Sequence, residues 1–225
     1  MIPLRDTIPS RRTAWITRIL LVLNVLAFAV ELRQGRRIES FLYQFGVVPA
    51  HWTVSSLSDL LDWPQLFLTL VTSQFLHGSF SHLGANMLYL WIFADNVEDR
   101  LGHVRFLLLY LVSGIAAAVT QLLLIPRAAV PMIGASGAIA GILGAYVLLF
   151  PTARIMTLVP LIFVWKTIEV PAVLFLGFWF LLQWIQGLVT IGQVAATGGV
   201  AVWAHIGGFV CGMIGIAWMR PRRRW

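Results

Sequence analysis

Fifty consecutive residues without a charged side chain, Val170 to Met219, constrain this chain more than any other feature of the sequence. About 20 consecutive apolar residues are enough to cross a bilayer as one helix. The run therefore has room for two helices, which we expect at about 171–188 and 202–219, with a small, uncharged linker at 192–199. The whole chain is 59% hydrophobic and 11% charged, whereas a soluble domain has about 25% charged residues. These features predict an integral membrane protein.

Four further apolar segments predict helices at about 15–30, 80–98, 104–125 and 136–150. Together with the two helices above, they indicate one compact, all-α bundle of six transmembrane helices rather than two domains. We divide the chain into a basic tail at 1–14, a helical domain at 15–219 and a basic tail at 220–225.

Two connections between these helices are long. The first, at 31–70, is amphipathic and combines tryptophans with mixed charge, which is typical of a segment that lies in the membrane interface. Its most informative residues are His51, Trp52, Asp59, Asp62 and Trp63. The second, at 151–170, is a connection bounded by prolines that carries Arg154, Lys166 and Glu169.

The formal net charge of +7 could suggest a nucleic-acid partner. The basic residues cluster instead at the ends of apolar segments and at the termini, which is the pattern of membrane topology. Six helices place both termini on one side of the membrane. That side would carry Arg5, Arg11, Arg12, Arg18, Arg100, Arg105, Arg154, Lys166, Arg220, Arg222, Arg223 and Arg224, and the other side Arg33, Arg36, Arg37 and Arg127. The positive-inside rule therefore predicts cytoplasmic termini and a bilayer, not a nucleic acid, as the partner.

A turn that leads into a helix is predicted around Ser136, where the sequence reads PMIGASGAIAG from 131 to 141. No charge follows until after Phe150, so the helix would be roughly 22 Å long. The hydrocarbon core of a bilayer is about 30 Å thick. The serine end of this short helix is therefore expected below the outer surface, with room for water above it.

Polar side chains within membrane spans are costly and mark candidate functional sites. The predicted spans contain few of them: Asn24, His82, Asn86, Ser113, Thr120, Gln121, Ser136, Gln183 and His205.

His205 is the predicted partner of Ser136, because both residues begin helices on the outer side. On the last helix, glycines follow His205 at spacings of three and four, and small residues recur on one face of the Ser136 helix; those of interest are Gly134, Gly137, Gly141, Gly208 and Gly212. Small residues at this spacing allow two helices to approach closely in lipid. Helix packing alone would explain the glycines. We expect the same packing to bring the imidazole to the hydroxyl, with His205 as general base and Ser136 as nucleophile. Since no acidic residue is expected at this depth, we predict a dyad rather than a triad.

His82 and Asn86 lie four residues apart on one helical face near the outer side. Acyl transfer needs donors that point at the developing oxyanion, and these two side chains with the backbone N–H of Ser136 would supply them. An interhelical hydrogen bond is the alternative explanation of His82 and Asn86.

A metal site is the competing explanation of His77 and His82. Their spacing of five does not place both on one helical face, and no His-Glu-x-x-His sequence is present. The single cysteine, Cys211, excludes a multi-cysteine metal site and a disulfide framework. We expect no metal and no cofactor.

These motifs together resemble the rhomboid family of intramembrane serine proteases. The resemblance is carried by Gly134-Ala135-Ser136-Gly137, by Ala204-His205-Ile206-Gly207-Gly208, and by His82-x-x-x-Asn86 followed by Glu98-Asp99-Arg100-Leu101-Gly102. It covers about residues 63–219 in the family's order, in the minimal six-helix, bacterial-type form. It implies a rhomboid-type bundle with a membrane-embedded first loop, a Ser136–His205 dyad, an oxyanion hole from His82, Asn86 and the Ser136 N–H, and transmembrane proteins as substrates. The fifth helix and the uncharged loop after it resemble the family's lateral gate and cap. Together with the topology predicted above, the resemblance indicates a bacterial inner membrane and a site open to the outer side.

The sequence departs from some members of that family in two places. The first loop has Trp52 and Trp63 but no Trp-Arg dipeptide. Ala140 stands four residues after Ser136, where some members have a tyrosine that packs on the histidine. The sequence does not show what orients His205 instead.

Two other function classes remain alternatives. A protein of the same fold could bind membrane helices for quality control without cutting them, but this would not explain why both Ser136 and His205 are present. A channel or transporter would require a polar path through the bundle, whereas the polar residues here gather near one surface.

Overall fold

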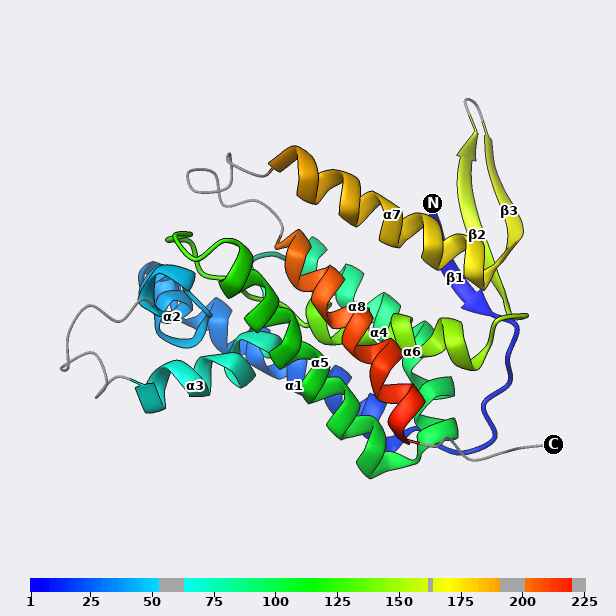
Figure 1. Cartoon of the computed structure of the whole chain (residues 1–225), viewed down its shortest axis with the longest axis horizontal. Coiled ribbons are helices and arrows are strands. Elements are labelled where there is room, and N and C mark those ends of the chain that lie inside the picture. Colours follow the sequence, from blue (N-terminus) through cyan, green and yellow to red (C-terminus); the bar gives the residue numbers. More distant parts are fainter. Residues whose placement is uncertain (53–62, 162–163, 191–200, 220–225) are drawn as a thin grey trace.

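The computed structural model describes residues 1–52, 63–161, 164–190 and 201–219 (Figure 1). Helices occur at all six expected places: α1 (Trp15–Arg33), α4 (Phe80–Leu101), α5 (His103–Leu124), α6 (Ser136–Leu149), α7 (Ala172–Thr190) and α8 (Val202–Met219). The expected linker at 192–199, the tail at 220–225, and Asp59 and Asp62 lie outside the described residues.

Four of the described helices, α1, α5, α7 and α8, are long and apolar enough to cross a membrane. This composition supports an integral membrane protein. Helix α6 has 14 residues, which corresponds to about 21 Å at 1.5 Å per residue. It is shorter than the other five helices of the bundle, because Gly134 turns the chain before it and Pro151 follows its end.

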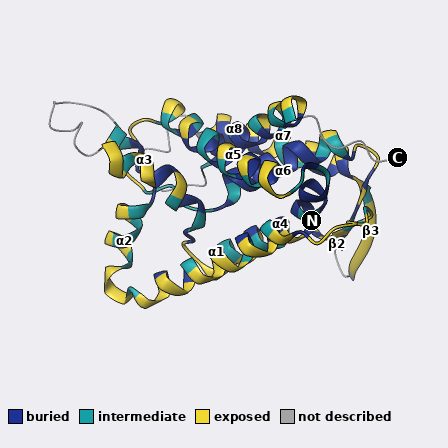
Figure 2. Cartoon of the chain, turned by 90° about the horizontal axis from the view of Figure 1, so that it is seen from below, coloured by how far each residue is buried: buried dark blue, intermediate teal, exposed yellow. Residues whose placement is uncertain are grey.

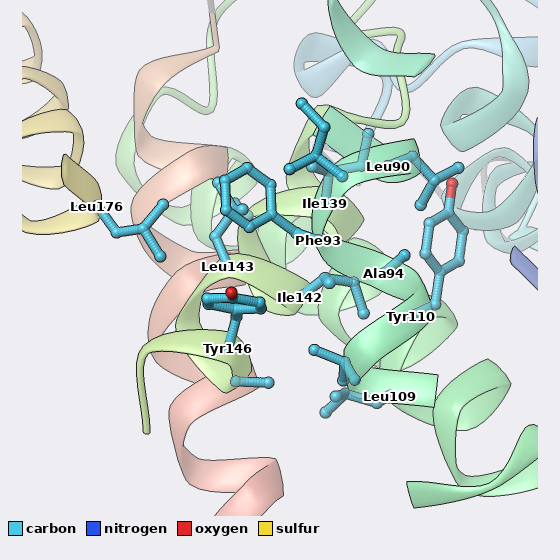
Figure 3. Packing of buried hydrophobic residues seen from close by; sticks show 14 of the residues in the cluster. Leu90, Phe93, Ala94, Leu109, Tyr110, Ile139, Ile142, Leu143, Tyr146 and Leu176 are labelled. Carbon is cyan, nitrogen blue, oxygen red and sulfur yellow. The ribbon is translucent and has the colours of Figure 1, made fainter. Parts of the chain in front are cut away.

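Helix α6 forms the centre of the bundle. Its residues 137–146 are all buried, whereas α1 is largely exposed on its outward face (Figure 2). Around α6, buried apolar side chains come from several helices, including Phe93 of α4, Tyr110 of α5 and Leu176 of α7 (Figure 3). The central position explains why α6 has no polar face: nearly every direction from it meets another helix.

Glycines allow α6 and α8 to pack with their backbones in contact. A Cβ added to Gly208 would overlap the carbonyl of Gly137, and one added to Gly212 would overlap the carbonyl of Gly141. In a bilayer, close van der Waals packing of small residues favours helix association because lipid tails are as apolar as the side chains. The two helices are thereby held at a short, fixed separation.

The all-α expectation is incomplete, because a three-stranded antiparallel sheet lies beside the bundle (Figure 1). Its strands are β1 (Ile2–Asp6), β2 (Arg154–Leu161) and β3 (Val164–Pro171), in the order β1-β2-β3. The expected simple connection at 151–170 is thus mostly a β-hairpin, and part of the tail at 1–14 is an edge strand. The β-branched residues of β2 and β3, among them Ile155, Thr157, Ile168 and Val170, favour extended backbone.

The first long connection contains short helical segments: the 3-10 helix Gly35–Arg37, α2 (Ile38–Phe45), the 3-10 helix Pro49–Trp52, α3 (Trp63–Thr72) and the 3-10 helix Ser73–Phe75. An isolated β-bridge joins Val47 to Met132, so this connection is tied to the turn before Ser136. Trp52 packs edge-on against Phe67 of α3, with 5.5 Å between ring centroids.

A buried carboxylate of α4 binds the start of helix α1. Glu98 accepts hydrogen bonds from the backbone N–H groups of Ile16 and Thr17 at 2.9 and 2.8 Å, and from Thr17 Oγ1 at 2.7 Å. A second carboxylate, Asp6 of β1, accepts from Tyr146 Oη at 2.5 Å and from Asn96 Nδ2 at 2.6 Å. The first N–H groups of a helix need acceptors, and a carboxylate there also complements the helix dipole. These bonds fasten the N-terminal segment to α4 and α6.

Candidate functional site

Ser136 and His205 meet where α6 and α8 begin. The distance from Ser136 Oγ to His205 Nε2 is 2.8 Å. His205 is buried and Ser136 is half-buried. No side chain caps the start of α6, so the positive end of its dipole points at the serine.

The hydrogen bonds of His205 define its tautomer. Its Nδ1 lies 2.8 Å from Gln183 Oε1. An amide oxygen can only accept, so Nδ1 carries the proton and Nε2 presents its lone pair. Ser136 Oγ–H therefore donates to Nε2, which is the arrangement in which a neutral imidazole can take the hydroxyl proton.

The start of α8 is fixed by α5. The backbone N–H of Ala204 in the first turn of α8 donates to Ala201 O at 3.1 Å and to Gln121 Oε1 of α5 at 3.3 Å. A Cβ on Gly207 would overlap the side chain of Thr120, so α5 and α8 are also in close contact one turn further along. These contacts set the position of His205.

Gly134 forms the turn before Ser136 with a φ of +122°, a backbone conformation that disfavours other residues. Its N–H donates to Ser73 O at 2.9 Å. A Cβ at this position would lie 2.7 Å from the His82 ring, so the turn has room for the imidazole only because residue 134 is glycine. The turn thus places Gly134 against His82 of α4, two residues before Ser136, and both His82 and Ser136 line the same cavity.

His82 and Asn86 are placed by the start of α4. Ser79 Oγ accepts from the backbone N–H of His82 at 3.1 Å, which is a standard N-cap. Asn86 Nδ2 donates to His77 Nε2 at 3.0 Å, and the backbone N–H of His77 donates to both carboxylate oxygens of Glu31 at 3.0 and 3.1 Å. One amide hydrogen of Asn86 is therefore bound to His77, and the second remains available to another acceptor.

These residues line one cavity of about 660 Å³. Its described lining contains Ser136, His205, His82, Asn86 and Trp179, and no Asp, Glu, Lys or Arg. Among the described residues no group of three or more His, Cys, Asp or Glu could hold a metal ion. The cavity therefore combines a serine–imidazole pair with neutral hydrogen-bond donors in largely apolar surroundings.

Three contacts of the site were not predicted from the sequence. His77, which was considered above only as one of two possible metal ligands, accepts a hydrogen bond from Asn86. Gln183 binds His205, and the ring of Trp179 lies 5.9 Å from the His205 ring, centroid to centroid. The available signal was the rarity of polar residues in α7: Gln183 stands one helical turn after Trp179, which puts both on one face.

The sequence matches the Rhomboid domain over residues 64–222. It is 35% identical over 144 residues to Rhomboid protein 1, mitochondrial, of Saccharomyces cerevisiae, which covers 62% of this chain and 38% of the yeast protein. It is 34% identical over 140 residues to Rhomboid-like protein 11, chloroplastic, of Arabidopsis thaliana (62% and 44%). It is 35% identical over 130 residues to Rhomboid protease GluP of Bacillus subtilis (57% and 23%).

The matched segment covers less than half of each of these three relatives. Within this chain, however, the Rhomboid domain extends over all of α4 to α8 and so includes every side chain that lines the cavity. This chain belongs to the rhomboid family.

Proposed function

We propose that the protein is an intramembrane serine endopeptidase that cleaves peptide bonds in or near transmembrane segments. The observation that supports this most directly is the 2.8 Å hydrogen bond between Ser136 Oγ and His205 Nε2 at the wall of a cavity. One of the relatives, GluP of Bacillus subtilis, is named a rhomboid protease.

In this mechanism Ser136 Oγ attacks the scissile carbonyl carbon while His205 Nε2 takes the hydroxyl proton. The tetrahedral intermediate then collapses, the C–N bond breaks, and the imidazolium of His205 gives its proton to the leaving amine. A water molecule then attacks the acyl carbon while the same imidazole takes its proton. The ester C–O bond breaks, the imidazolium returns the proton to Ser136 Oγ, and the carboxylic acid product leaves. The two groups act as a dyad, since no carboxylate lines the described cavity.

The oxyanion would be bound by the backbone N–H of Ser136, by the second amide hydrogen of Asn86 and by a ring N–H of His82. All three groups line the same cavity. Each such donor contributes roughly 10²–10³ in rate, because it is already oriented before charge develops.

In the membrane, we assign six spanning helices, α1, α4, α5, α6, α7 and α8. The end of the bundle that holds β1 and the C-terminus of α8 is the more basic one, and the positive-inside rule assigns it to the cytoplasm. The cavity then opens toward the opposite, outer side, as expected for a protein of a bacterial inner membrane. The named compartments of the relatives include mitochondria and chloroplasts, in which the same rule assigns the basic end to the matrix or stroma.

A fluorophosphonate probe with a reporter tag tests this function, because it labels only an activated serine. The wild-type protein in detergent micelles should be labelled and should cleave a co-reconstituted single-span substrate. Ser136→Ala should lose both labelling and cleavage with an unchanged melting temperature, whereas Ser113→Ala, a buried serine of α5 outside the cavity, should retain labelling. A folded wild-type protein that binds the helical substrate but is neither labelled nor active would favour the non-cleaving alternative.

A further inference from the structure

The orientation of His205 is unexplained by the Ser136 helix, because residue 140 is alanine and offers no ring to pack on the imidazole. The contacts that hold the imidazole come from α7 instead. Gln183 Oε1 accepts from Nδ1 at 2.8 Å, and the Trp179 ring packs beside the imidazole, 5.9 Å away between centroids and tilted by 36°. The two contacts restrict different motions of the imidazole. The hydrogen bond limits rotation of the ring in its own plane, and the ring contact limits its tilt.

The placement of Gln183 is unusual for a residue of α7. This helix is exposed over much of its length, with Leu174, Leu181 and Leu188 facing outward. Gln183 is buried, at 8% exposure. Helix α7 carries no charge and has only two side-chain amides, Gln183 and Gln186. A buried amide is costly unless it is hydrogen-bonded, and for Gln183 the imidazole is the partner that the structure provides.

We infer that Gln183 is a positioning residue for His205, with Trp179 as its packing support. Gln183 holds the proton on Nδ1 and so keeps the lone pair of Nε2 directed at Ser136. The imidazole then presents the Nε2 lone pair to Ser136 only while α7 is docked against α8. This inference rests on the proposed function for its meaning in catalysis, although the tautomer can be measured without it.

The groups that face His205 determine what a pH profile reports. Ser136 of α6 and Gln183 of α7 bind the two ring nitrogens, and Trp179 of α7 packs beside the ring. His82 and Tyr89 of α4 line the same cavity, and the uncharged Gln121 of α5 binds the start of α8. A carboxylate introduced at position 183 would therefore be the one acidic group beside the imidazole among the described residues.

The experiment compares two substitutions of Gln183 with a matched control on the same helix. Gln183→Met keeps the length of the side chain but removes the acceptor. Gln183→Glu keeps an acceptor and adds a charge. Leu181→Met, at an exposed position of α7, is the control. For each protein, the second-order rate of fluorophosphonate labelling of Ser136 is measured across pH, together with kcat and KM for a single-span substrate.

We expect Gln183→Met to slow labelling roughly 10- to 100-fold, which is part of the 10²–10⁴ that a general base contributes. The loss should fall on kcat rather than KM. Gln183→Glu should recover most of the rate at high pH and shift the acidic limb of the profile to higher pH, because a carboxylate on Nδ1–H stabilises the imidazolium. Leu181→Met should match the wild type.

Two results would overturn the inference: Gln183→Met labelling at the wild-type rate, or a Gln183→Glu profile that superimposes on the wild-type profile. If Gln183→Met loses activity, ¹⁵N NMR of histidine-labelled protein, with the His205 signal assigned from a His205→Ala sample, shows whether misfolding or tautomer is the cause. A protonated Nδ1 in the wild type and a mixed tautomer in folded Gln183→Met support the inference, and an unchanged tautomer contradicts it. Absence of labelling in the wild type would instead reject the proposed function.

Discussion

Buried and half-buried polar groups occupy both ends of the helical bundle, and they differ in what they contact. The cavity end comprises Ser136, His205, Gln183, His82 and Asn86. The anchoring end comprises Asp6, Thr17, Asn96, Glu98 and Tyr146. Helix α6 joins them, because Ser136 begins it and Tyr146 lies near its other end.

At the anchoring end, the polar groups are used to attach one segment to another. Glu98 accepts from two backbone N–H groups and a hydroxyl at the start of α1, and His103 Nδ1 lies 2.5 Å from it. Burying a carboxylate is costly, and several charge-assisted hydrogen bonds offset that cost. At the cavity end the groups are neutral, and a space of about 660 Å³ lies beside them. Burial of polar residues therefore does not distinguish an attachment from a candidate active site, whereas a serine hydroxyl that is hydrogen-bonded to an imidazole beside a cavity does.

The largest expected effect is the removal of the imidazole at the cavity end. His205→Ala should lower cleavage on the order of 10⁴-fold or more, as loss of the base does in serine proteases, with little change in melting temperature. His103→Ala, at the anchoring end, is the matched control and should retain near-wild-type cleavage. Comparable loss of activity in the two variants would remove the functional difference between the ends.

The next effect concerns the oxyanion donors. Asn86→Ala should lower kcat roughly 10²–10³-fold with a smaller change in KM, because the amide is expected to act on the developing charge. Asn96→Ala is its counterpart at the anchoring end, where the amide binds Asp6, and should change stability rather than kcat. Steady-state cleavage of a single-span substrate by equal amounts of folded protein measures both. An Asn86→Ala protein with wild-type kcat would show that this amide only holds His77.

Stability should depend more on the anchoring end than on the cavity end. Glu98→Ala leaves the N–H groups of Ile16 and Thr17 without their acceptor, and an unsatisfied buried donor costs about 1–3 kcal/mol. We expect a loss of about 2–3 kcal/mol in the free energy of unfolding, measured by denaturant titration in mixed micelles, with cleavage per folded molecule preserved. Glu169→Ala removes only an exposed pair with Arg154, with 3.9 Å between the charged atoms, and should cost less than about 0.5 kcal/mol. Equal losses in the two variants would contradict a specific role of Glu98.

The smallest effect is the pH dependence of the Asp6 attachment. Burial raises the pKa of Asp6 from 3.8 to about 6, and nearby Asp95 contributes to the increase. Because the pKa is higher in the folded protein, protonation stabilises the folded state; this stabilisation is complete below pH 4 and is lost as the pH rises through 6. Since the carboxyl is partly exposed, we expect less than about 1 kcal/mol.

Asp6→Asn tests this by removing the titrating group while keeping an acceptor for Tyr146 and Asn96. Thermal unfolding of the wild type and the variant between pH 4 and pH 7.5 should give curves whose difference changes through this window. A constant difference across the window would show that Asp6 titrates outside it.

The sequence determined the helices of this protein, because each corresponds to a continuous apolar segment with local signals at its ends. Ser79 before α4, Gly102 after it and Gly134 before α6 are local devices that need no distant partner. The candidate residues Ser136, His205, His82 and Asn86 could also be chosen from the sequence, since polar side chains are so rare in the apolar segments. Strands β2 and β3 carried a β-branched signal that the prolines at 151 and 171 obscured.

Only the tertiary structure decided which polar groups meet. Strand β1 has a weak local signal, and it forms because it pairs with β2, whose partner residues run from Ile155 to Leu158. Gln183 was visible as a polar residue in α7, but its bond to His205 depends on the relative rotation and depth of two helices. Side-chain spacing fixes which residues share a face of one helix, whereas the packing of glycines and the alignment of neighbouring helices fix what that face contacts. The same physical reason separates Glu98, which binds α1, from Ser136, which borders a cavity.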